Sequence, residues 1–254
     1  MNSRKRFYDT VTFENVDGGF VVQLDGKAIK TPGGLDLLLP TDVLADAVAQ
    51  EWQNQTDIIN PFSMPMMQLS CTAIERVQPS MTEMCDQIRN YANTDLICYF
   101  ADGPDDLCQR QKHDWGKIHQ WLFDIYGIKF NTTTGIMACD QNKLEIEKLI
   151  NIFNEFDHFW LTACIETMQI FGSAILALAL VKNQLSPEQA YDHSAIDADW
   201  QSERWGEDHE YIANRKNRLN DCLNAHRFLS LLTTQKNRDQ THSIHAIPLE
   251  KQRV

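Results

Sequence analysis

The sequence predicts an α+β protein, in which a small antiparallel β-rich N-terminal domain precedes a larger all-helical C-terminal domain. The prediction depends on a change of hydrophobic period at Pro40. Before it, apolar and polar residues alternate as in half-buried strands, and after it apolar residues recur every three or four positions as on one helix face. We place the β-rich domain at residues 1–75, the helical domain at 76–235 and a polar tail at 236–254.

Two turn signals organise the predicted sheet. Residues 17–19, Asp-Gly-Gly, separate a first strand around Val11 and Phe13 from a second strand, and Asp25-Gly26 is a tight hairpin signal. One face of the second strand carries Phe20, Val22 and Leu24. A return strand over 27–30 and a further alternating stretch over 35–39 follow. A sheet this small cannot stand alone, so we expect a helix to cover its apolar face.

The first predicted helix starts at Thr41, a residue type that caps helix N-termini. Its apolar stripe is formed by Leu44, Val48 and Trp52. We expect Trp52 to belong to the structural core, and its neighbours Glu51 and Gln55 to lie near solvent. A loop bracketed by Pro61 and Pro65 follows and cannot continue the helix.

Two further helices are predicted in the middle of the chain. Residues 80–83, Ser-Met-Thr-Glu, form a capping-box pattern for the first. Pro104 opens the second, a long helix that ends at Gly127 and carries Trp115 on its apolar stripe, so we also assign Trp115 to the structural core. The apolar run 96–100 fits either a strand or a buried helix.

The helical pattern returns from about Lys143 to Val181. Its last part, 170–181, predicts one buried core helix, and it is too short for the ~20 residues that span a bilayer. Ser186, followed by proline, starts another helix, and Trp205-Gly206 marks the boundary before the last one.

Composition excludes several classes of function. The formal net charge of −12 disfavours nucleic acid and anionic membrane surfaces as partners, and it suits a partner with exposed cations. The seven cysteines include no C-x-x-C pair, which favours a reducing compartment over disulfides or a zinc site. No secretory signal follows the basic residues 4–6, and strand-like alternation by Tyr8 disfavours a transit peptide.

No motif for covalent chemistry, nucleotide binding or metal binding is found, so we expect no catalytic residues, no metal and no cofactor. The nearest approach to a catalytic set is Cys108, His113 and Asp114. On a helix, residues five positions apart point in different directions, which argues against a thiol and its base.

The segment 203–210 gathers acids around one tryptophan beside a glycine. It has two interpretations. It is a helix end with a solvated acidic face and a tryptophan folded onto the core, or it is a docking patch, because tryptophan with nearby charge is common at binding hot spots. As candidate partner-binding residues we take Glu203, Arg204, Trp205 and Asp208.

The order and spacing of several short segments resemble the assembly chaperones that bind the alpha subunit of F-type ATP synthase. The segments are Arg6-Phe7-Tyr8; Leu24-Asp25-Gly26-Lys27; Lys30-Thr31-Pro32; Leu39-Pro40; Leu44-Ala45; Glu51-Trp52-Gln53-Asn54-Gln55; Met64-Pro65; Thr72-Ala73-Ile74; Tyr91, Thr94-Asp95, Leu107, Gln111 and Trp115; and, more loosely, Gln201, Glu203, Trp205 and Gly206. Cys71 and Glu75 depart from the pattern, where asparagine and aspartate are expected.

The resemblance implies a protein that is not an enzyme and that holds the alpha subunit soluble until the beta subunit takes its place. It implies no small-molecule substrate, no nucleic acid and no membrane insertion. We expect the bacterial cytoplasm, or the mitochondrial matrix if the source is eukaryotic. Two alternatives stay open: a small-molecule enzyme with a cleft between the two domains, and a scaffold for another client.

Overall fold

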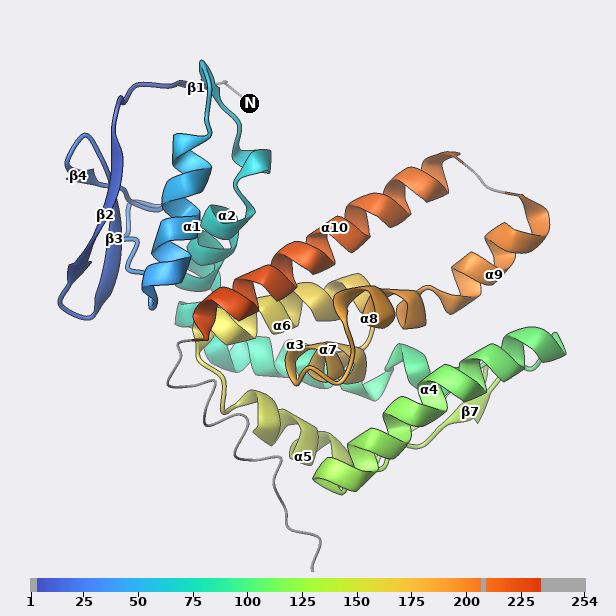
Figure 1. The fold of residues 1–254 in the computed structure, drawn as a ribbon. Helices are drawn as coiled ribbons and strands as arrows, with labels where there is room; N and C mark the ends of the chain where they lie inside the picture. The colour runs from blue at the N-terminus through green and yellow to red at the C-terminus, as the bar shows by residue number, and fades with distance from the viewer. Residues whose placement is uncertain (1–3, 207–208, 234–254) are drawn as a thin grey trace, which may run out of the picture.

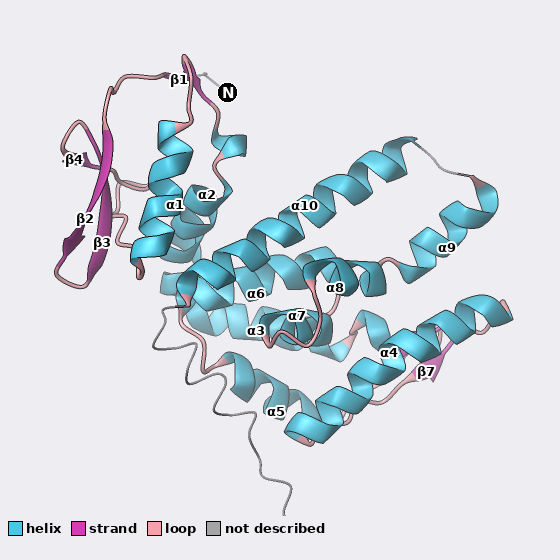
Figure 2. Ribbon diagram, viewed as in Figure 1, coloured by secondary structure: helices cyan, strands magenta, loops and turns pink. Residues whose placement is uncertain are grey.

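The computed structural model describes residues 4–206 and 209–233, and it confirms the predicted α+β arrangement. A small sheet lies at one end of the molecule, and helices make up most of the rest (Figures 1 and 2). The strands are β1 (Arg4–Lys5), β2 (Val11–Val16), β3 (Gly19–Leu24), β4 (Lys27–Ala28), β5 (Ile58–Ile59), β6 (Tyr99–Phe100) and β7 (Thr133–Thr134).

The helices are α1 (Asp42–Gln53), α2 (Pro65–Thr72), α3 (Met81–Asn93), α4 (Asp105–Tyr126), α5 (Lys143–Phe153), α6 (His158–Phe171), α7 (Ala174–Val181), α8 (Pro187–Ser194), α9 (Ile196–Trp205) and α10 (His209–Leu232). No helix among the described residues combines the length and the apolarity needed to cross a bilayer.

The main sheet is antiparallel with strand order β2-β3-β4. Asp25 and Gly26 form the predicted tight turn, and both have positive φ, 49° and 75°, as a two-residue hairpin with the right twist requires. The expected return strand is shorter than predicted, but backbone pairs Lys30–Asp36 and Phe20–Leu39 continue the pairing beyond it. Helix α1 packs on this sheet and buries Val22 and Leu24, so the expected helical cover is present.

A second, two-stranded antiparallel sheet pairs β1 with β5 and was not predicted. Strands of two residues carry no period that a sequence pattern could reveal. The Arg6 side chain holds the pair in place, because its guanidinium donates to the backbone oxygens of Gln53 and Gln55 at the end of α1. The N-terminal segment is thereby attached to the carboxyl end of the first helix.

The expectation that Glu51 and Gln55 lie near solvent is wrong. Glu51 is 8% exposed and Gln55 is 5% exposed. The Glu51 carboxylate accepts hydrogen bonds from the backbone N–H groups of Met66 and Met67, at 2.7 and 2.8 Å, which are the otherwise unpaired donors at the start of α2. Burial raises the pKa of Glu51, and these two donors act against that rise.

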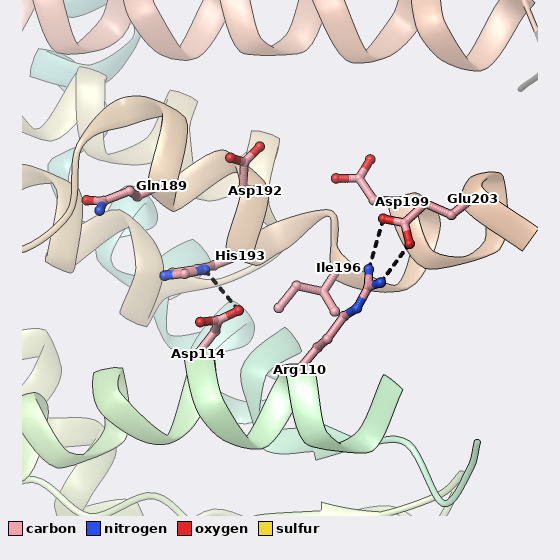
Figure 3. Close-up of a pocket in the computed structure, with 8 residues that line it drawn as sticks. All are labelled: Arg110, Asp114, Gln189, Asp192, His193, Ile196, Asp199 and Glu203. Carbon is pink, nitrogen blue, oxygen red and sulfur yellow. Dashed lines mark hydrogen bonds and ion pairs between the residues drawn. The ribbon is translucent and has the colours of Figure 1, made fainter. Parts of the chain in front are cut away.

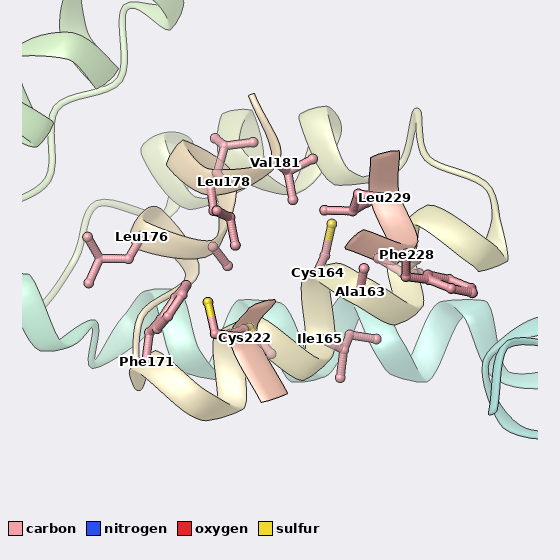
Figure 4. Packing of buried hydrophobic residues seen from close by; sticks show 14 of the residues in the cluster. Ala163, Cys164, Ile165, Phe171, Leu176, Leu178, Val181, Cys222, Phe228 and Leu229 are labelled. Carbon is pink, nitrogen blue, oxygen red and sulfur yellow. The ribbon is translucent and has the colours of Figure 1, made fainter. Parts of the chain in front are cut away.

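One hydrophobic cluster runs through both expected domains. A π-helical turn, Ala73–Val77, crosses the boundary set at residue 75, and its apolar side chains join the same cluster. Figure 4 shows part of the cluster, where α6, α7 and α10 bury side chains against one another. The division into domains at residue 75 stays a prediction.

The predicted helix over 170–181 is divided in two. Gly172, with φ of 68°, ends α6, and the Ser173 side chain caps the start of α7 by accepting from Leu176 N–H. Asp95 supports the same junction, because its buried carboxylate accepts from the N–H groups of Ile97 and Ile175. The run 96–100 is likewise divided, into a 3₁₀ turn and β6.

The capping box predicted at Ser80 does not form, whereas Ser186, predicted as a helix start, does form one, and this gives a matched test. Ser186 forms its capping box with Gln189, whereas the Ser80 side chain makes no capping hydrogen bond, because a 3₁₀ turn leads directly into α3. We expect Ser186→Ala to lower the free energy of unfolding by about 1 kcal/mol, and Ser80→Ala to leave it nearly unchanged. Urea denaturation measures both, and equal losses would contradict the assignment.

Candidate partner-binding site

A hollow of about 300 Å³ lies between α4, α8 and α9. Figure 3 shows its side chains, which come from these three helices. They are Arg110, Asp114, Gln189, Asp192, His193, Ile196, Asp199 and Glu203. Four carboxylates and a single guanidinium make the lining acidic, in agreement with the negative charge of the chain.

Glu203 lies at the edge of this hollow and forms a two-pronged ion pair with Arg110 of α4. The guanidinium nitrogens lie 2.9 and 2.7 Å from the two carboxylate oxygens. Hydrogen bonding to Arg110 holds the pKa of Glu203 below its usual value. Both side chains remain about half exposed, so the pair contributes little to stability and leaves charge accessible to a partner.

Next to this pair, aromatic and charged side chains stack on the outer part of α9. The Arg204 guanidinium lies 4.7 Å from the centre of the Trp200 ring and donates to the Asp106 carboxylate at 2.6 Å. Hydrogen bonds from Trp200 and Arg204 lower the pKa of Asp106 to about 2. The Trp205 ring meets Trp200 edge to face at 5.8 Å and is 75% exposed.

Trp205 is therefore not folded onto the core, which is where the solvated-helix-end interpretation placed it. An indole exposed to this extent beside mixed charges has the composition of a binding hot spot.

Arg215 of α10 joins α8 and α9 behind the hollow. Its guanidinium contacts Asp199 at 2.8 and 2.9 Å and Asp192 at 2.7 Å, and the Tyr211 hydroxyl also donates to Asp199. Burial alone would raise the pKa of Asp199, but the donors Arg215 and Tyr211 outweigh burial and lower it. Asp199 and Asp192 are thus already paired with Arg215 of α10.

The hollow has little capacity for covalent chemistry. His193 lies 3.9 Å from Asp114, and burial lowers the pKa of His193, which favours its neutral form. Cys108 does not take part, because its thiol donates to the Ala101 backbone oxygen instead. No thiol or hydroxyl lines the hollow, so its geometry suits the electrostatic capture of a cationic side chain better than catalysis.

The structure describes three of the four predicted partner-binding residues. Glu203, Arg204 and Trp205 share one end of α9, and Asp208 lies outside the described residues. No sequence pattern indicates Arg110, Asp106 and Arg215, which are 93, 98 and 16 positions from their partners Glu203, Arg204 and Asp199. Such ion pairs leave no local pattern. Described residues include no group of three metal-ligating side chains.

Neither of the two tryptophans that we assigned to the core lines this hollow. Trp115 is fully buried, and its indole N–H donates to the His193 backbone oxygen at 2.8 Å. Trp52 is half-buried, packs edge to face on Tyr8 at 5.6 Å, and its indole N–H has no hydrogen-bond partner within the described part of the chain.

A second hollow, of about 360 Å³, lies between α1, the turn before α2, and α10. Its titratable lining residues are Glu51 and Arg227. The Glu51 carboxylate is already held by two backbone N–H groups, so it is poorly placed to act as a general base. This hollow gives no support to an enzyme with a cleft between the two expected domains.

Comparison with known proteins gives consistent matches. The family described as ATP12 chaperone protein matches residues 5–123. The crystal structure of Atp12 from Paracoccus denitrificans is 33% identical, with a TM-score of 0.87 over 90% of this chain and 98% of that one. A crystal structure of the Atu1473 protein from Agrobacterium tumefaciens is 35% identical, with a TM-score of 0.86 over 90% and 86% of the two chains. The mitochondrial protein atp12 of Schizosaccharomyces pombe is 24% identical over 85% of this chain and 80% of its own length.

Proposed function

Because this chain belongs to the ATP12 chaperone family, whose members are non-enzymatic assembly chaperones of ATP synthase, we propose that it holds the free alpha subunit of F-type ATP synthase soluble until the beta subunit replaces it. The alpha subunit is the client that the resemblance of the sequence motifs implies. The bacterial cytoplasm, or the mitochondrial matrix in a eukaryote, is part of the same proposal.

The observation that carries the proposal is the exposed Trp205 ring beside the acidic hollow. A free subunit exposes apolar surface that aggregates, and its chaperone must cover this surface and still be displaced by the true partner. A binding site that combines one large ring with acidic side chains meets both needs, because charged contacts speed capture and are exchanged more easily than a fully apolar interface.

The proposal is tested with purified subunits. The isolated alpha subunit is diluted into buffer with an equal concentration of this protein, and light scattering reports aggregation. We expect suppression of aggregation, a complex with the alpha subunit on size exclusion, no complex with the beta subunit, and release of this protein when the beta subunit is added. If the alpha subunit aggregates at an unchanged rate, the proposed client is wrong.

Glu203→Lys tests the patch itself. The substitution reverses one charge at the rim and places a second cation against Arg110. We expect the affinity for the alpha subunit to fall by about tenfold or more, while the free energy of unfolding stays nearly unchanged, because the lost ion pair is exposed. Calorimetry measures the affinity, and urea denaturation measures the stability.

The charge swap Arg110→Glu with Glu203→Lys is the matched control. It restores an ion pair between α4 and α9 but keeps the lysine at the rim. If Glu203 itself faces the client, binding stays weak in the swapped protein. If the swap restores full affinity, Glu203 acts only through its pair with Arg110.

A further inference from the structure

The main sheet ends in an open edge. Because the strand order is β2-β3-β4, β2 has a strand partner on one side only among the residues that the structure describes. The register with β3 pairs Val11 with Leu24, Phe13 with Val22 and Asn15 with Phe20. The other edge of the sheet is partly covered, since Ile29 N–H donates to the Val22 oxygen, and Phe20 and Leu39 exchange backbone hydrogen bonds.

The register between β2 and β3 determines which backbone groups of β2 point outward. Asp25 N–H donates to the Thr10 oxygen, so the hydrogen-bonded pairs with β3 fall at Thr10, Thr12 and Glu14. The N–H and C=O groups of Val11, Phe13 and Asn15 therefore face away from β3. No hydrogen bond from the described residues reaches these outward groups.

Apart from the charge of Glu14, the edge lacks the features that usually protect an exposed strand. It has no proline, no lysine and no bulge, and β2 is as long as its six-residue partner β3. Phe13 is 37% exposed although it lies on the same sheet face as the buried Val22. The apolar face beneath α1 therefore extends to the edge, where a further strand would continue it.

The negative charge at this edge favours one kind of added strand over another. Glu14 is the one charged residue of β2, and it lies on the sheet face opposite to Phe13. Pairing β2 with β2 of a second copy, centred on Phe13 or on Glu14, brings two Glu14 carboxylates together on one face, in molecules that each carry a net charge of −12. A strand with apolar residues on the inner face and a basic residue opposite Glu14 meets no such repulsion.

We propose that the outer edge of β2 binds an extended segment of the client by strand addition, with backbone hydrogen bonds at Val11, Phe13 and Asn15. The segment has apolar side chains toward Phe13 and a lysine or arginine toward Glu14. The inference rests on the proposed function, and it assigns the sheet a second contact, separate from the acidic hollow. Main-chain pairing supplies affinity with little dependence on sequence.

Hydrogen exchange on the unaltered protein tests the inference. Free protein is compared with its complex with the isolated alpha subunit, using amide-resolved exchange. The amides of Thr12 and Glu14 are slow in both states because β3 already binds them. We expect the amides of Phe13 and Asn15 to exchange rapidly in the free protein and about tenfold or more slowly in the complex. Unchanged exchange of these two amides in a stable complex overturns strand addition and leaves the proposed function standing.

A pair of substitutions tests the same edge by affinity. Phe13→Pro removes an outward N–H and blocks the edge without removing a hydrogen bond to β3, whereas Phe13→Ala loses the same ring and keeps the N–H. Once thermal melting shows both variants folded, we expect the proline variant to bind the alpha subunit about tenfold more weakly than the alanine variant. Equal affinities contradict the inference. If no complex forms even with the unaltered protein, the proposed function itself fails, and strand addition to that client fails with it.

Discussion

We expect Trp115→Ala to lower the free energy of unfolding by about 4 kcal/mol, within the range of about 3–5 kcal/mol for large buried side chains. Trp115 is 0% exposed, its indole N–H donates to the His193 oxygen, and its ring meets Phe100 edge to face at 5.3 Å. The truncation creates a cavity between α4 and its neighbours and removes the hydrogen bond to the end of α8. Urea denaturation with two spectroscopic probes measures the loss.

Trp205→Ala is the control for this prediction. It removes the same side chain from a position that is 75% exposed. We expect a change in stability within about 0.5 kcal/mol, as for most surface substitutions. If the two alanine variants lose similar stability, Trp115 does not anchor the core.

The second large effect concerns Asp95, whose carboxylate is fully buried at the start of α7. Burial raises the pKa of Asp95 from 3.8 to about 6, although Ser173 and nearby backbone N–H groups act in the opposite direction. Because the folded pKa lies above the unfolded value, this group stabilises the fold fully below about pH 4, and the contribution is lost as the pH rises through about 6. The loss is roughly 3 kcal/mol, at about 1.4 kcal/mol per pKa unit.

Asp95→Asn removes the titrating group and keeps a similar shape. We expect the stability advantage of the unaltered protein over this variant to shrink by roughly 3 kcal/mol between about pH 4 and pH 7. Urea denaturation of both proteins across this range measures the difference. Two parallel curves of stability against pH would show that Asp95 has the same pKa in the folded and unfolded states.

Local signals predicted the elements that local physics decides. The Asp25-Gly26 turn, the Thr41 cap and the long helix from Pro104 to Gly127 follow from backbone conformation and capping alone, and the structure confirms all three. The exposure of Glu51 could not be predicted in this way. Its carboxylate caps α2, a helix that begins only after the proline-bracketed loop, so its environment depends on tertiary structure.

The candidate site, too, could be predicted from the sequence only in part. The sequence indicated Glu203, Arg204 and Trp205 by their composition, yet it gave no sign of Arg110 or Asp106, which hold the first two in place. The open edge of β2 depends on strand order, which periodicity does not encode. Period and composition identify faces and helix ends, and only the packed structure identifies their partners.

The Thr41 side chain, which caps α1, also donates a hydrogen bond to the Leu231 oxygen of α10, 190 positions later. The same helix contributes Cys222, Phe228, Leu229 and Leu232 to the core. A ribosome releases residues in order, so the sheet and α1 emerge long before the helix that completes their packing. The core of the newly made polypeptide therefore stays incomplete until α10 has been synthesised, and apolar surface that α10 covers in the folded protein is exposed until then.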